Sequence, residues 1–283
     1  MHVLHLDSGR TMGGGQWQVL RLIDGLARLG VESTLLARKG GALFSAAEQK
    51  GWRVEPLSLF RAARKYDLVH AHDARGHTLA ALAGAQRLIV ARRVAFPIHS
   101  SAASRWKYSK ATHYIAVSEF VRAILTGAGI PADKTTVVYD GVPLLESTTS
   151  ERTGVVALPN KTLPGLDIKL TTNLEHDLPR AAAFVYITAC EGLGSAILLA
   201  MSAGTPVIAS NTGGIPEVIR HRENGLLVES DPAAISDVVS KLLADPGEAS
   251  RLGSAGRQTV AQRFTLDQMV RNTMEVYHRV LGC

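Results

Sequence analysis

The chain has 283 residues, of which 46% are hydrophobic and 20% charged, with a net charge of +6 at pH 7. These values are typical of a soluble globular protein of two domains. No apolar run reaches the roughly 18 residues that span a bilayer. The two cysteines exclude a disulfide framework, and the 5% aromatic content disfavours nucleic-acid binding. The first residues lack the long apolar region of a signal peptide, so we expect a cytoplasmic protein.

Short apolar segments alternate with amphipathic stretches over the first half of the chain. After a first strand, we expect a turn at 12–15 and a helix at 17–29, whose leucine and isoleucine residues recur at helical spacing before Gly30. The strands predicted in this half are 2–7, 31–37, 52–57, 67–72, 87–92, 113–118 and 135–141. Alternation of strands and helices predicts a parallel sheet covered on both faces, with ligands at the carboxyl ends of its strands.

A polar stretch without periodicity, 143–153, is interpreted as an interdomain linker. Further strands are expected near 153–158, 184–188 and 206–210, and three helical stretches close the chain. The predicted domains are therefore 1–143 and 153–264, followed by a C-terminal helix at 265–283 with apolar residues on one face.

Residues 191–228 carry the strongest functional signal. Glu191 stands on a glycine turn before an apolar helix, and a second turn, Gly213 and Gly214, precedes Glu217. Glycine turns and helix N-termini expose backbone N–H groups that suit phosphate, and neighbouring acids suit sugar hydroxyls. A nucleotide-sugar has both parts.

Three glycines, Gly13, Gly14 and Gly15, follow the first predicted strand and precede a helix. Close backbone approach and the positive end of a helix would suit a phosphate there. A plain turn between strand and helix is an equal alternative.

His70, His72 and Asp73 end the strand DLVHAHD, and the two histidines share one face of it. One imidazole could hydrogen-bond a sugar or a phosphate. A structural pair of histidines is the alternative. Metal binding is disfavoured because no third ligand is evident.

Four segments together resemble the retaining glycosyltransferases of family 4. They are 191–228, DLVHAHD at 67–73, IAVSEFVRAIL at 115–125 and VVYDGV at 137–142. The resemblance implies the GT-B fold, in which two Rossmann-like domains face each other across a cleft and the final helix packs back on the first domain. It implies transfer of a sugar from a nucleotide-diphosphate sugar to a cytoplasmic-face acceptor such as a glycolipid or lipopolysaccharide precursor. Neither a metal nor another cofactor is expected.

The resemblance also implies roles for individual residues. Glu191 would orient the donor sugar, and His72 would touch the transferring sugar or the acceptor. Donor binding is assigned to Gly13, Gly14, Gly15, Arg93, Lys161, Gly192, Leu193, Gly194, Gly213, Gly214 and Glu217. Arg92 and His99 are alternatives to Arg93, and Lys169 is an alternative to Lys161.

Two departures from the family pattern stand out. Leu199 occupies the place of a second glutamate that holds the ribose hydroxyls, and only 48 residues separate Val142 from Glu191. We therefore expect a shortened second domain, which could complete itself in a homodimer. A degenerate protein that binds a nucleotide or a partner without turnover is the alternative function. Basic residues could contact an anionic membrane, whereas MGGGQWQ lacks the spacing of a nicotinamide site.

Overall fold

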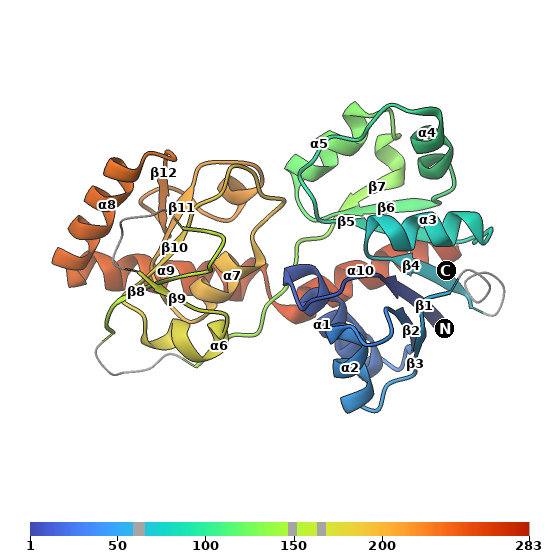
Figure 1. Ribbon diagram of the computed structural model, residues 1–283, viewed down its shortest axis with the longest axis horizontal. Helices are drawn as coiled ribbons and strands as arrows, with labels where there is room; N and C mark the ends of the chain where they lie inside the picture. The colour runs from blue at the N-terminus through green and yellow to red at the C-terminus, as the bar shows by residue number, and fades with distance from the viewer. Residues whose placement is uncertain (59–65, 147–151, 163–167, 283) are drawn as a thin grey trace. The chain divides into compact units, whose positions relative to one another are not determined.

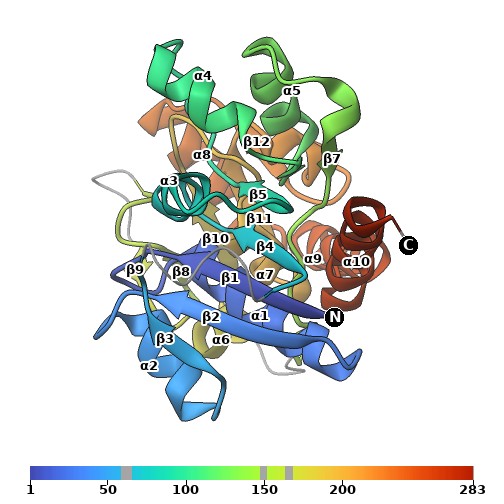
Figure 2. The same ribbon diagram turned by 90° about the vertical axis from the view of Figure 1, so that its right-hand side faces the viewer.

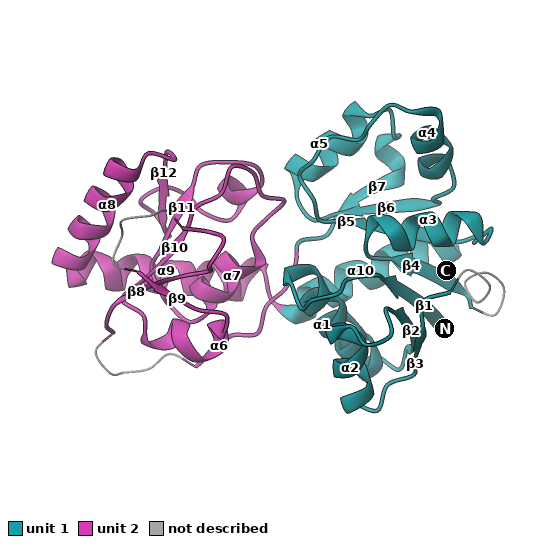
Figure 3. Ribbon diagram, viewed as in Figure 1, with its two compact units in different colours: residues 1–139, 266–283 teal, residues 140–265 magenta. Residues whose placement is uncertain are grey.

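The computed structural model describes residues 1–58, 66–146, 152–162 and 168–282 (Figure 1). The central part of the predicted linker, 147–151, lies outside these residues. The chain divides into two compact units, each built on its own parallel sheet (Figure 3). Unit 1 comprises Met1–Tyr139 and Leu266–Cys283, and unit 2 comprises Asp140–Thr265. The prediction of two α/β domains is confirmed.

Unit 1 has a seven-stranded sheet in the order β3-β2-β1-β4-β5-β6-β7, in which β1 lies between β2 and β4 (Figure 2). Its strands are β1 (His2–Asp7), β2 (Glu32–Ala37), β3 (Val54–Pro56), β4 (Leu68–Ala71), β5 (Leu88–Arg92), β6 (His113–Ala116) and β7 (Thr135–Val137). Its helices are α1 (Gly14–Arg28), α2 (Ala42–Gln49), α3 (Ala74–Leu82), α4 (Ala102–Ser109), α5 (Glu119–Gly127), the 3-10 turn η1 (Ala132–Lys134) and α10 (Leu266–Leu281).

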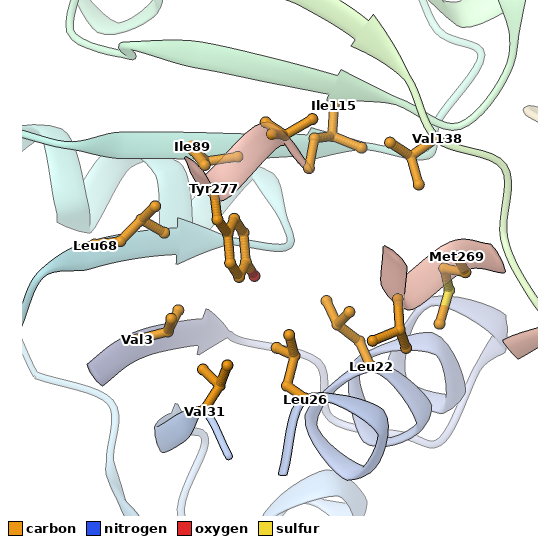
Figure 4. Packing of buried hydrophobic residues seen from close by; sticks show 12 residues of the cluster. Val3, Leu22, Leu26, Val31, Leu68, Ile89, Ile115, Val138, Met269 and Tyr277 are labelled. Carbon is orange, nitrogen blue, oxygen red and sulfur yellow. The ribbon is translucent and has the colours of Figure 1, made fainter. Parts of the chain in front are cut away.

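One face of this sheet is covered by α1 and α10. Val3 of β1 and Leu68 of β4 lie in a buried cluster with Leu22 of α1 and Tyr277 of α10 (Figure 4). Because side chains alternate across a strand, the neighbouring Leu6 points to the opposite face, where it meets α3 at Gly76. His5 and Asp7 therefore share the face of Val3.

Unit 2 has a five-stranded sheet in the order β12-β11-β10-β8-β9. Its strands are β8 (Val155–Ala157), β9 (Lys169–Leu170), β10 (Ala183–Tyr186), β11 (Val207–Ser210) and β12 (Leu226–Val228). Its helices are α6 (Leu174–Asp177), α7 (Ser195–Ser202), α8 (Pro232–Ala244) and α9 (Pro246–Arg263), with 3-10 turns η2 (Leu178–Arg180) and η3 (Ile215–Glu217). The segments that enter and leave this unit lie side by side, since the Val142 N–H donates to the Phe264 carbonyl.

Two details differ from the sequence prediction. Helix α1 begins at Gly14 rather than Trp17, because Gly13 takes the N-cap position and its N–H donates to Gln16 Oε1 at 3.2 Å. The short strands β9 and β12 were not predicted, since they span two and three residues and present too little pattern.

Candidate functional site

Glu191 follows β10 at the carboxyl edge of the sheet in unit 2. Its Oε2 atom accepts hydrogen bonds from Tyr186 Oη at 2.5 Å and Lys161 Nζ at 3.2 Å. Its Oε1 atom accepts one from the Gly192 N–H at 3.0 Å. Both carboxylate oxygens are therefore held, so the side chain has one fixed orientation.

Lys161 follows β8, the strand next to β10, and is mostly buried. Its Nζ atom donates to Thr188 Oγ1 at 2.9 Å and lies 5.0 Å from the centre of the Tyr186 ring. Burial and the Glu191 carboxylate together raise the pKa of Tyr186, so this phenol stays a hydrogen-bond donor. The alternative cation, Lys169, lies elsewhere, paired with Asp177 at 2.9 Å.

The second glycine turn, after β11, packs directly on the Glu191 backbone. The Gly214 N–H donates to the Glu191 carbonyl at 3.0 Å. Gly213 has φ +60°, and a Cβ there would lie 2.1 Å from that carbonyl oxygen. Only glycine fits this position, for conformation and for space alike. Glu217 lies in η3, one turn further along the chain.

Helix α7 begins directly after the first glycine turn. Gly194 is its N-cap with φ +95°, so the backbone N–H groups of the first helical turn lie close to Glu191 in sequence. The Leu193 side chain is buried, which leaves only its backbone for a ligand. Ser195 donates to Asp140 Oδ2 at 2.8 Å. Leu199 is 6% exposed and contributes to the core rather than to a polar site.

In unit 1, the glycine loop lies beside an acid that sequence analysis did not single out. Asp7 ends β1, accepts from the Gly9 N–H at 2.8 Å and accepts from Gln16 Nε2 at 3.0 and 3.1 Å. Burial raises the pKa of Asp7 above its usual value. Of the predicted trio, Gly13 caps α1, whereas Gly14 and Gly15 are helical.

His70 and His72 do lie together, and a third histidine joins them. His5 Nδ1 lies 3.0 Å from His72 Nε2, and His70 Nδ1 lies 2.7 Å from Tyr277 Oη. Burial lowers the pKa of His5 to about 3 and holds the pKa values of His70 and His72 well below 6.5, so all three are neutral near pH 7. The expectation that no third ligand is available for a metal is therefore wrong.

The remaining candidates of unit 1 differ in where their side chains point. Asp73 caps α3 by accepting from the Gly76 N–H at 2.6 Å and also accepts from the Ser8 N–H at 2.9 Å, which is a structural role. Arg92 donates to Tyr108 Oη at 2.9 Å and to the Phe96 carbonyl. The charge of Arg93 acts on His70, His72 and Asp7. His99 is exposed.

The structure adds residues that sequence analysis missed, namely His5, Asp7, Gln16, Asp140, Tyr186 and Thr188. A signal existed for some of them. Asp7, Tyr186 and Thr188 lie at or just after the carboxyl ends of β1 and β10, where ligands of such sheets bind. His5 could be found from the alternation of β1, but its partner on β4 depends on strand order.

Two family models match the chain. One described as "Glycosyltransferase Family 4" matches residues 12–145, and one described as "Glycosyl transferases group 1" matches residues 168–259. Among solved structures, HepE of Anabaena in complex with UDP-glucose has a TM-score of 0.86 at 17% identity, covering 99% of this chain and 100% of that one. Sucrose-phosphate synthase of Thermosynechococcus elongatus has a TM-score of 0.77 at 16% identity, with 100% and 99% covered. These likenesses establish the fold.

Curated relatives match over shorter stretches. The alpha-maltose-1-phosphate synthase of Mycobacterium tuberculosis is 35% identical over 136 residues, which are 46% of this chain and 33% of that protein. A GDP-mannose-dependent phosphatidylinositol monomannoside mannosyltransferase of the same organism is 41% identical over 80 residues, 28% of this chain and 21% of that protein. The chain thus spans about a third or less of the length of these relatives. None of its described helices is long and apolar enough to cross a membrane.

Proposed function

The chain belongs to glycosyltransferase family 4, and from this premise we propose that it transfers a sugar from a nucleotide-diphosphate sugar to an acceptor, with retention of anomeric configuration. HepE of Anabaena, with nearly the same fold, was crystallised with UDP-glucose, with UDP and with UDP and glucose. Two curated relatives are a synthase of maltose-1-phosphate and a mannosyltransferase. These proteins support the class of reaction.

One observation carries the proposal, the arrangement around Glu191. A lysine, a carboxylate and two glycine turns come from three neighbouring strands and meet at the carboxyl edge of one sheet. The lysine and the N-terminus of α7 suit the diphosphate, and the carboxylate suits the hydroxyls of the donor sugar. This edge is where open α/β sheets bind nucleotides.

In the proposed reaction the leaving group is a nucleoside diphosphate, on which negative charge develops as the glycosidic bond breaks. Lys161 and the first N–H groups of α7 stabilise that charge, so transfer needs no metal ion. Binding of the diphosphate replaces part of the ion pair between Lys161 and Glu191. Glu191, still held by Tyr186 and the Gly192 N–H, then orients the sugar. The leaving phosphate takes the proton of the acceptor hydroxyl on the same face, which retains the configuration.

The acceptor is assigned to unit 1 and is proposed to be a glycolipid or a related envelope precursor at the cytoplasmic face of a membrane. Helix α4 has no buried residue and carries Arg105, Trp106 and Lys107, and Lys110 is its C-cap. Phe96, just before it, is 70% exposed. Cationic and aromatic side chains together favour an anionic membrane surface. The name of the mannosyltransferase relative, whose acceptor is a phosphatidylinositol derivative, agrees with this choice.

Leu199 favours a second function, in which the protein binds a nucleotide without turnover. Leucine cannot accept hydrogen bonds from ribose hydroxyls, and here it is buried in the core. Losing a charged hydrogen bond weakens binding by about 1.5–3 kcal/mol, roughly ten- to a hundredfold. The loss of this hydrogen bond lowers donor affinity but leaves Lys161 and Glu191 in place. We therefore keep sugar transfer as the proposed function.

The test is release of nucleoside diphosphate from UDP-, GDP- and ADP-sugars by the purified chain, with lipid extracts as acceptors. We expect release from one nucleotide class and at least a tenfold lower rate in Glu191→Ala. Binding of a nucleotide without release from any sugar would favour the second function. The variant Leu199→Glu further distinguishes the enzyme from the binding protein. Faster release of nucleoside diphosphate than in the wild type would indicate a weakened enzyme. No release in either folded form would mark a binding protein.

A further inference from the structure

Three histidines meet on the face of the unit 1 sheet that α1 and α10 cover. His5 of β1 and His70 of β4 are partners in the parallel register, and His72 follows two residues later on the same side. Their exposed fractions are 0%, 1% and 6%. The ring centres of His70 and His72 are 4.0 Å apart, and those of His5 and His72 are 5.2 Å apart.

Two nitrogens of this cluster have no hydrogen-bond partner among the described residues. They are His70 Nε2 and His72 Nδ1, both buried. A buried polar atom left unpaired destabilises a fold by about 1–3 kcal/mol. The unpaired His70 Nε2 therefore indicates a ligand shared with the neighbouring imidazoles, of which His72 faces His5 with Nε2 rather than with the unpaired Nδ1.

In two of the three rings, those of His70 and His5, the outer nitrogen is held in the manner of metal-ligating histidines. His70 has Nδ1 on the Tyr277 hydroxyl at 2.7 Å, which leaves Nε2 for a ligand. His5 has Nε2 3.3 Å from Ser33 Oγ, so a ligand would bind Nδ1 in place of its hydrogen bond with His72 Nε2. In metal sites the second ring nitrogen is usually bonded to an oxygen in this way, which fixes the ring and its tautomer.

The spacing of the inner nitrogens fits one ion. One ligand atom from each histidine lies within 4.8 Å of those of the other two, and His5 Nδ1 lies 3.0 Å from His72 Nε2. With zinc–nitrogen bonds of about 2.0–2.1 Å, two ligands on one tetrahedral ion are about 3.3 Å apart. An ion between them would replace the hydrogen bond that joins His5 Nδ1 to His72 Nε2.

We propose that His5, His70 and His72 form a three-histidine site for a divalent transition-metal ion of the zinc class. Imidazole ligands select Zn²⁺ and its neighbours over Mg²⁺ and Ca²⁺, which prefer oxygen. The ion joins β1 to β4 and so stabilises unit 1. All three ligands belong to unit 1, whereas Glu191 belongs to unit 2, and the proposal holds whether or not the chain transfers a sugar.

The test is titration of the metal-stripped full chain with Co²⁺, followed by its visible absorption, and then displacement with Zn²⁺. We expect one ion per chain, the intense band of tetrahedral Co²⁺, and a higher melting temperature with Zn²⁺. His5→Gln and His70→Gln should lose the band. His113→Gln, which removes another buried histidine of the same sheet, should keep it.

Three results would overturn the proposal. The first is no saturable Co²⁺ band in the wild-type chain, which needs no variant and no assumption about folding. The second is a band that persists in His5→Gln and His70→Gln when circular dichroism shows them folded, because exposed histidines would then bind the ion. The third is loss of the band in His113→Gln while that variant remains folded.

Discussion

At the scale of single residues, the Glu191 carboxylate is the best-defined group in unit 2. It accepts three hydrogen bonds from three different residues, and one donor is a cation. Such an arrangement fixes a side chain before any ligand arrives, which reduces the entropy lost on binding. In the proposed donor site, the charge of Lys161 and the shape of the glycine turns make separate contributions. Two pairs of variants distinguish them.

Lys161→Met removes the cation and keeps the side chain as far as the ε position. We expect nucleoside diphosphate affinity to fall by a factor of about ten to a hundred, because a charged hydrogen bond contributes about 1.5–3 kcal/mol. Titration calorimetry measures the affinity of each variant for the nucleoside diphosphate. The control is Lys169→Met, since that lysine also pairs with a carboxylate but is 65% exposed. Equal affinities in the two variants would show that Lys161 does not bind the diphosphate.

Gly213→Ala tests the shape of the second glycine turn. The new Cβ would lie 2.1 Å from the Glu191 carbonyl oxygen, so we expect the free energy of unfolding to drop by more than 2 kcal/mol. Gly154→Ala is the matched control, because Gly154 also has positive φ in unit 2 but has open space around its Cβ. Urea unfolding monitored by circular dichroism compares them. A drop no larger in Gly213→Ala than in the control would mean that the turn does not press on Glu191.

At the scale of elements, helix α10 packs on α1 through a glycine. A Cβ on Gly25 of α1 would lie 2.3 Å from Val270 Cγ2, and Val270 is β-branched and stiff. Helix α10 thereby belongs to the core of unit 1, although the 126 residues of unit 2 (Asp140–Thr265) separate it from Tyr139 in the sequence.

Gly25→Ala should therefore destabilise unit 1, although glycine to alanine inside a helix ordinarily stabilises by about 0.5–1 kcal/mol. Gly15→Ala, in the same helix with nothing within 4 Å of its Cβ, should show the ordinary stabilisation. Thermal unfolding measures the change in stability of both variants. Adding Val270→Ala to Gly25→Ala should recover part of the loss, and a stabilising Gly25→Ala would contradict the packing described.

The sequence predicted elements well where their patterns were long. The strands of unit 1 and the helices α1 and α10 have clear periodicity, whereas β9 and β12 are too short to show any. The glycine turns and Glu191 were found because glycines, acids and helix starts follow one another in the chain. His5 was missed for a different reason: it meets His70 only through pairing of β1 with β4, which lies 65 residues away.

At the scale of the whole molecule, the buried histidines make stability depend on pH. Five of them lie in unit 1, with the pKa of His5 lowered to about 3, those of His77 and His113 lowered to about 4, and those of His70 and His72 held well below 6.5. Burial is the main cause in each case. The unfolded chain binds more protons below pH 6.5, so folding is favoured above that pH and is opposed as the pH falls toward these lower values.

We therefore expect the free energy of unfolding of unit 1 to fall by several kcal/mol between pH 7 and pH 5. His5 alone contributes about 2 kcal/mol of this, at 1.36 kcal/mol per pKa unit. Tryptophan fluorescence in urea reports on this unit alone, because Trp17, Trp52 and Trp106 all belong to it. His5→Gln should weaken the dependence. A urea midpoint that is the same at pH 7 and pH 5 would refute this prediction.

We propose that the carboxyl edge of the unit 2 sheet holds the donor, and titration calorimetry with UDP, GDP and ADP tests this proposal. We predict one binding site for one of these nucleotides, with affinity lowered at least tenfold in Glu191→Ala. Affinity should be unchanged in Glu223→Ala, which removes an exposed acid of the same unit. Failure of all three nucleotides to bind, or equal affinity in the wild type and Glu191→Ala, would show that the donor does not bind at Glu191.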